Sequence, residues 1–256
     1  MLKFFSKIRQ SILSEGKTGK YFKYAIGEIV LVVIGILIAL QINNWNENRK
    51  ASNLEQSYYC LLLEDIEQDK EQIKSLIEIN EKRIEHSNKA IALIQSENIK
   101  LNVLGDKINL SRRDGIQSFI PNSSTYEDIK SSGNINTLRD NNIRKSLNQY
   151  YRKTQELNGV ILTNMGLVIS RMTQTGDWFD IGGLHPFKEL FPKEIQDKLR
   201  IDLPEDIPNE TKSRLYEDLV FEGVLLRRRS ELLKFIENEV DIMKSKLTKQ
   251  CNLKDL

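Results

Sequence analysis

The chain has 256 residues, and its 38 Lys and Arg nearly balance its 36 Asp and Glu, for a formal net charge of +2 at pH 7. Six of the basic residues and two of the acids precede residue 46, which leaves 32 basic against 34 acidic residues, a net charge of about −2. This near-neutral remainder argues against a nucleic-acid-binding protein, which would need a clustered positive surface.

Residues 1–23 are expected to form a cytoplasmic, basic and amphipathic segment. They hold six Lys and Arg against the single acid Glu15, and an excess of positive charge marks the cytoplasmic side of a membrane anchor. Four apolar residues recur at helical spacing: Leu2, Phe5, Ile8 and Ile12. This spacing is typical of a helix lying on an anionic inner leaflet, and the alternative is a solvated basic tail that only fixes the topology.

Residues 24–45 have the length and composition of a transmembrane helix. At 1.5 Å per residue the separation from Tyr24 to Trp45 is roughly 32 Å, which matches a hydrocarbon core of about 30 Å. Tyr24 and Trp45 mark the two ends, where amphipathic rings prefer the headgroup level. A cleaved signal peptide is the alternative. The length of the segment and the poor cleavage site at Ala39-Leu40-Gln41 favour an uncleaved anchor.

Glu28 is the one ionisable residue between Ala25 and Leu40. A charged group inside the bilayer is costly, so it raises a functional hypothesis by default. The interpretation we favour is that Glu28 lies one turn inside the boundary and extends toward the interface. The alternative is that it pairs with a partner helix, which the small residues Gly35 and Ala39 would allow to approach closely.

Residues 46–256 are expected to form an extracytoplasmic helical bundle. Heptad-like apolar patterns predict three long helices, from Leu54 to about Ile99, from about Asp140 to Thr175, and from about Asn209 to Gln250. Nothing between Trp45 and Leu54 breaks a helix, so the first can continue directly from the anchor. The fold class is therefore all-α: a single N-terminal transmembrane helix followed by an elongated antiparallel bundle of three long helices with short connecting helices.

Two connections join these helices. The first contains a predicted short helix, Thr125 to Ser132, with capping-box spacing at its start and Gly133 as a left-handed stop. The second, Gly176 to Pro208, is long and contains a possible short helix from Pro192 to Arg200. The residues of this connection that would contact a partner are Trp178, Phe179 and His185. We interpret this connection as a packed cap, with a partner-binding loop as the alternative.

The two cysteines, Cys60 and Cys251, bear on the topology. If the three long helices run up, down and up, these thiols lie at opposite ends of the bundle, far beyond the roughly 7 Å Cα separation that a disulfide allows. We therefore predict no intramolecular disulfide. The run Arg227-Arg228-Arg229 is interpreted as a solvated face, with docking of phospholipid or acidic glycan as the alternative.

Two stretches of the chain resemble a known family. YAIGEIVLVVIGILIALQINNWNENRK, preceded by MLKFFSKIRQ, closely resembles the N-terminus of an uncharacterised, domain-of-unknown-function family of single-pass membrane proteins in Gram-negative bacteria. TYEDIKSSGNINTLRDNNIRKSLNQYY, from Thr125 to Tyr151, is similar to that family's internal signature. The resemblance implies a helical domain on a single anchor in the bacterial inner membrane, with a cytoplasmic N-terminus and a periplasmic C-terminal domain. It implies no activity, cofactor or catalytic residue.

Motifs for catalysis or metal binding were not found. His86 and His185 have no second ligand at metal-ligand spacing, and Asp177 and Asp180 are interpreted as solvated loop acids rather than cation ligands. We therefore predict no catalytic, metal-binding or cofactor-binding residues. The lipid bilayer and a protein partner or second copy, held through the anchor and the bundle, are the predicted partners.

The predicted function is that of an interaction, scaffold or sensory subunit of the envelope. The alternative is a membrane-tethered hydrolase or glycan-acting enzyme. Its site would be assembled from the loops around Ser123 to Gly133 and Trp178 to His185.

Overall fold

The computed structural model describes residues 18–113, 115, 117–177, 185–196 and 206–252, and all regular elements within these ranges are helices. Clustering of contacts divides the chain into two compact units, Met1–Glu55 and Gln56–Leu256. The elements in chain order are α2 (Thr18–Ile94), α3 (Leu101–Arg112), α4 (Ser124–Ser131), the 3₁₀ helix η1 (Asn134–Thr137), α5 (Asn141–Thr175), the 3₁₀ helix η2 (His185–Leu190), α7 (Lys193–Gln196) and α8 (Asn209–Cys251).

The first unit contains the apolar half of α2. This helix has 77 residues and runs without a break, as the lack of a breaker between Trp45 and Leu54 predicts. An 18-residue window within it has a mean hydropathy of 2.6, and none of that window is buried. By length and composition, α2 is the one helix among the described residues that could cross a membrane.

The second unit is built from the rest of α2 together with α5 and α8. The heptad positions Ile66, Ile73, Asn80 and Ser87 of α2 are all buried, so the predicted stripe faces the core. Asn80 is accommodated there because its side-chain amide donates to the carbonyl oxygen of Leu226 at 3.0 Å. On α8, the seven-residue repeat from Leu219 to Leu247 is likewise buried.

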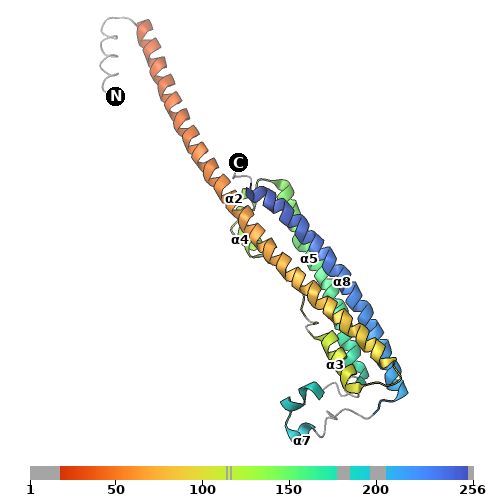
Figure 1. Ribbon diagram of the computed structural model, residues 1–256. Coiled ribbons are helices and arrows are strands. Elements are labelled where there is room, and N and C mark those ends of the chain that lie inside the picture. The colour runs from red at the N-terminus through yellow and green to blue at the C-terminus, as the bar shows by residue number, and fades with distance from the viewer. Residues whose placement is uncertain (1–17, 114, 116, 178–184, 197–205, 253–256) are drawn as a thin grey trace. The chain divides into compact units, whose positions relative to one another are not determined.

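Side-chain contacts fix the direction of each long helix. α8 is antiparallel to α2, because Cys60 bonds to Cys251 whereas Asn80 contacts Leu226. It is also antiparallel to α5 (Figure 1), with Lys246 bonded to Ser146 near one end and Arg171 to Asp218 near the other.

α2 and α5 run parallel to each other, so the expected up, down and up order is wrong. Asp69 of α2 contacts Tyr150 of α5. Farther along both helices, Arg83 and Met165 both lie beside Gly115. Two parallel helices that follow one another in the chain need a connection that returns along the bundle.

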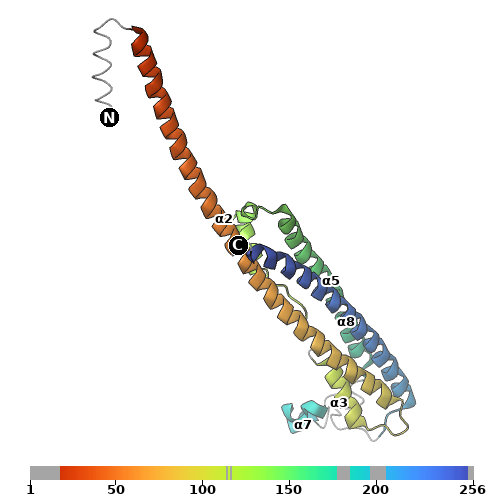
Figure 2. The same cartoon turned by 45° about the horizontal axis from the view of Figure 1, so that its top comes forward.

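The connection between α2 and α5, residues 95–140, supplies this return and is called the return connection. Its contacts move steadily backward along α2: Ser111 bonds to Arg83, Asn122 to Asp69 and Asn134 to Tyr58. The segment includes α3, which has no counterpart among the predicted helices because its apolar pattern spans only three turns. Figure 1 labels α3 and α4 at different levels along α2, and Figure 2 shows the same arrangement in a second view.

Several local predictions of helix boundaries are confirmed. The predicted short helix is α4, which ends beside Gly133 at φ 75°, a left-handed conformation that glycine adopts without steric cost. Asp140 caps α5 by accepting a bond from the backbone N–H of Asn142 at 2.7 Å. α5 ends before Gly176, which has φ 68°. Of the possible helix from Pro192 to Arg200, only the part Lys193–Gln196 is described, as α7, and residues 197–205 lie outside the described ranges.

Candidate functional site

The five predicted anchor residues, Tyr24, Glu28, Gly35, Ala39 and Trp45, all belong to α2. Gly35 and Ala39 are exposed, and a Cβ added at Gly35 would meet nothing within 4 Å. Trp45 is 64% exposed, and the guanidinium carbon of Arg49 lies 5.3 Å from its ring centroid. Glu28 is half-buried, and its side chain takes part in at least one polar or electrostatic interaction. The side chain of Tyr24 is outside the part of the chain that the structure describes.

The predicted partner-binding loop is only partly described. Trp178, Phe179 and Asp180 lie outside the described residues, and His185 begins η2. Asp177 is 1% exposed and accepts bonds from the guanidinium of Arg214 at 2.9 and 3.0 Å. The expectation that Asp177 is a solvated loop acid is therefore wrong. Its carboxylate instead ties the second residue after the end of α5 to the first turns of α8.

A junction of two buried acids joins α2 to the start of α4. Asp65 and Asp69 stand one helical turn apart and are 6% and 1% exposed. Asp65 accepts the backbone N–H of Thr125 at 3.0 Å, and Asp69 accepts that of Asn122 at 2.7 Å. The carboxylates thus satisfy backbone donors at the α4 N-terminus, a role usually played by the cap residue itself.

Tyr150 of α5 completes this acid junction. Its hydroxyl donates to Asp69 at 2.6 Å, and the neighbouring Tyr151 hydroxyl donates to the carbonyl oxygen of Asn122 at 3.1 Å. Tyr151 also stacks on Tyr126 of α4, with ring centroids 4.6 Å apart. The junction therefore joins α2, α4 and α5 through a hydrogen-bonded network.

Burial sets the electrostatics of the acid junction. It raises the pKa of Asp69 to about 6, with a contribution from the negative charge of Asp65, and outweighs the opposing effect of the hydrogen bonds from Tyr150 and Asn122. Burial likewise raises the pKa of the Tyr150 and Tyr151 hydroxyls. Both tyrosines therefore remain neutral donors at physiological pH.

Two buried arginines hold the return connection and form a second junction. Arg83 of α2 donates to the carbonyl oxygen of Ser111 at 2.7 Å. Arg229 of α8 donates to that of Gly115 at 2.8 Å and to that of Gln117 at 2.5 Å. These carbonyls lie at or beyond the end of α3, where helical carbonyls lack intrahelical partners. Burial and the nearby charge of Arg83 lower the pKa of Arg229 to about 10.

The triple arginine is therefore not uniformly solvated. Arg228 pairs with Glu231 at 2.7 Å on the surface, with its side chain 51% exposed, whereas Arg229 is 2% exposed. The expectation of a solvated face is wrong for Arg229. Heptad position could have indicated this, because Arg229 follows Leu226 by three residues on the side of α8 that faces the bundle.

The buried acid Glu222 of α8 completes the second junction. It accepts bonds from the Ser111 hydroxyl and from the Nε of Arg112, each at 3.0 Å. This arrangement links the end of α3 to α8. Among the described residues, no group of three or more His, Cys, Asp or Glu side chains is placed to hold a metal ion.

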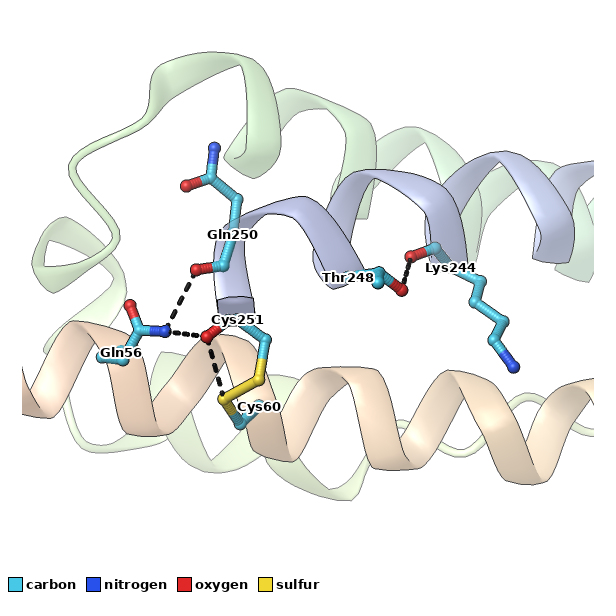
Figure 3. Close-up of a disulfide and its surroundings, with 6 residues drawn as sticks. All are labelled: Gln56, Cys60, Lys244, Thr248, Gln250 and Cys251. Carbon is cyan, nitrogen blue, oxygen red and sulfur yellow. Dashed lines mark hydrogen bonds between the residues drawn. A yellow bond between two sulfur atoms is a disulfide. The ribbon is translucent and has the colours of Figure 1, made fainter. Parts of the chain in front are cut away.

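Cys60 and Cys251 form a disulfide, with their Cα atoms 5.0 Å apart. Figure 3 shows the bridge between α2 and the last turn of α8, beside Gln56, which donates to the carbonyl oxygens of Gln250 and Cys251. The prediction of no intramolecular disulfide is wrong. The return connection makes an additional reversal of the chain, which brings the end of α8 back to the level of Cys60.

Described residues at or beside the two loops proposed for an enzyme site lie at different ends of α5. Tyr126 of α4 bonds to Asn148 near the start of α5, whereas Asp177, directly before Trp178, follows its last turn. The 28 residues from Asn148 to Thr175 span about 40 Å at the rise of an α-helix. This is the separation of the first loop from Asp177, and residues 178–184 of the second loop lie outside the described ranges.

Comparisons with known proteins identify a family but no activity. No curated protein matches the chain, and no solved structure does. A family model described as a family of unknown function, DUF6090, matches residues 28–164. This match covers more than half of the chain, from the apolar half of α2 through α4 into the second half of α5. The chain therefore belongs to the DUF6090 family of unknown function.

Proposed function

We propose that this protein is a membrane-anchored interaction subunit of the bacterial envelope, acting as a scaffold or sensory component. The observation that carries the proposal is the contrast within α2. Its N-terminal half exposes a continuous apolar surface, from Ile26 to Ile42, and its C-terminal half buries a heptad stripe. Residues 24–45 would cross the inner membrane, and the bundle would lie in the periplasm.

Two features support this orientation. The basic residues that precede the anchor favour a cytoplasmic N-terminus under the positive-inside rule. The Cys60–Cys251 disulfide favours a compartment outside the cytosol for the bundle, because disulfides persist in oxidising environments and are rare where thiols are kept reduced. The charge pattern and the cysteine pair are independent of each other.

The internal polar groups favour an interaction role over catalysis. The buried side chains bond to backbone groups of the return connection: Asp65 and Asp69 accept from N–H groups, and Arg229 donates to a carbonyl oxygen. These side chains therefore hold the bundle together. The hydrolase alternative would need a pocket with convergent polar groups from both loops, and residues 178–184 of its second loop lie outside the described ranges. We propose no catalytic residue or cofactor.

The anchor is a proposed contact with a partner helix. Gly35 and Ala39 would form the close-approach surface, and Glu28 would pair with a basic or hydroxyl group of the partner. Replacing Glu28 with Gln and Gly35 with Leu should weaken crosslinked complexes in membranes. Unchanged complexes would remove the anchor from the interaction.

Topology is tested by protease treatment of spheroplasts that express the full chain with a C-terminal epitope. We expect the epitope to be lost from intact spheroplasts and the protein to remain in the membrane after alkaline extraction. A cytoplasmic protein marker controls for lysis. A protected epitope would contradict the periplasmic orientation, and recovery of the chain in the soluble fraction would contradict the anchor.

A further inference from the structure

The second half of α5 presents an apolar surface without charge. Residues 157–170 read LNGVILTNMGLVIS and contain no ionisable side chain. Four large apolar side chains are 43–50% exposed there: Val160, Leu162, Leu167 and Ile169. A surface helix of a soluble domain usually has polar or charged residues on the side that faces water. We call this side of residues 157–173 the α5 face; Arg171, the one charged residue in that range, pairs with Asp218 of α8.

The first half of the same helix is an internal comparison. Residues 141–156 include five charged side chains, at Arg144, Lys145, Arg152, Lys153 and Glu156. Their apolar residues Ile143, Leu147 and Tyr150 are buried in the bundle core. The change from a charged to an uncharged exterior therefore occurs within one continuous helix, at about Leu157.

The α5 face has the repeat of a helix–helix seam. Small residues recur along its middle at alternating separations of four and three, and all are exposed: Gly159, Thr163, Gly166, Ser170 and Thr173. This alternation is the spacing of the contact line between two helices wound around each other. The four large apolar residues flank the line in pairs seven residues apart. A Cβ added at Gly159 or Gly166 would meet nothing within 4 Å, so this chain leaves the line open.

We propose that the α5 face packs against the α5 face of a second copy of this chain. A symmetric pair places the same surface on both sides of the contact. A face without charge can do so without bringing like charges together, whereas the charged exterior of residues 141–156 cannot. The five small residues are centred on Gly166, so this residue lies next to its own copy whether the two helices are parallel or antiparallel.

Membrane anchoring would strengthen such a pair, and this step rests on the proposed function. Two chains confined to one bilayer meet at a high effective concentration, so a modest apolar interface is sufficient for association.

The test is disulfide crosslinking of the full chain in native membranes. The variant Gly166→Cys should give a covalent dimer on non-reducing gels, several-fold more than the matched control Gln155→Cys, which lies on the charged half of α5. Adding Leu162→Glu and Leu167→Glu to the Gly166→Cys variant should reduce the dimer to the control level. Adding Gln149→Glu and Gln155→Glu instead introduces the same charge outside the face and should leave the dimer unchanged.

Three outcomes would overturn the proposal: equal crosslinking of the Gly166→Cys and Gln155→Cys variants, a dimer insensitive to the two Leu→Glu changes, or a crosslinked product whose mass is not twice that of the chain. Fractionation of the same samples separates this inference from the anchor. A membrane-bound chain without dimer contradicts only the α5 face. A dimer recovered in the soluble fraction supports the face and contradicts the anchor.

Discussion

Cys60 and Cys251 are bonded across a sequence separation of 191 residues, with their Cα atoms 5.0 Å apart. The bridge closes nearly the whole second unit into one covalent loop. Because a cross-link reduces the entropy of the unfolded chain, a loop of this size corresponds to a stabilisation of at most about 5 kcal/mol. The Cys60–Cys251 bridge also requires α2 and α5 to run parallel to each other.

Replacing Cys60 with Ser should lower the free energy of unfolding by about 2 to 5 kcal/mol. Denaturant unfolding of the full chain in detergent, followed by circular dichroism, measures this difference. A reducing agent should destabilise the wild-type protein by a similar amount and leave Cys60→Ser unaffected. A wild-type protein whose two thiols are alkylated without prior reduction would contradict the bridge.

Replacing Asp69 with Asn should change the pH dependence of stability. Burial raises the pKa of Asp69 from 3.8 to about 6, so the folded state binds this proton more tightly than the unfolded chain. The stabilisation of the folded state by the protonated Asp69 side chain therefore increases as the pH falls through 6 and is lost as the pH rises. Between pH 7.5 and 5 the wild-type protein should gain about 1.4 kcal/mol more than Asp69→Asn. Parallel slopes of unfolding free energy against pH in both proteins would show that Asp69 does not titrate there.

Replacing Arg229 with Met should destabilise the bundle by about 3 kcal/mol or more, because the carbonyls of Gly115 and Gln117 lose their buried donor. The matched control is Arg228→Met, whose exposed ion pair with Glu231 contributes less than about 1 kcal/mol. Thermal unfolding of the two variants gives the comparison. Similar losses in both would contradict a buried anchoring role for Arg229.

Replacing Gly115 with Ala should destabilise the protein by about 1 to 3 kcal/mol. An added Cβ would lie 2.8 Å from Arg83 Nη2 and 2.9 Å from the carbonyl oxygen of Arg112, so the return connection must move. Gly223→Ala is the control, since its Cβ would make ordinary contacts of 3.5 and 3.7 Å and alanine favours the helix by about 1 kcal/mol. Denaturation midpoints should therefore move in opposite directions. A stabilising Gly115→Ala change would show that this site is not tightly packed.

The residues alone determined the long apolar segment near the N-terminus, the long helices and most of their ends. A run of apolar residues without charge and a repeat every seven residues are local properties, and Gly133, Asp140 and Gly176 act on their own backbone. Neither property indicates which segment packs against an apolar stripe or in which direction that segment runs. Between Arg113 and Ser123 the chain has no repeat, so the return along α2 had no signal in the sequence.

Only the tertiary structure decided the cysteine pairing and the roles of Asp69 and Arg229. A stripe on α2 requires an apolar partner, but a helix in either direction would satisfy it, because burial of apolar surface is non-directional. Hydrogen bonds and disulfides require particular atoms to meet at fixed distances. Those meetings depend on the return connection, which places Asn122 beside Asp69, Gly115 beside Arg229, and the end of α8 beside Cys60.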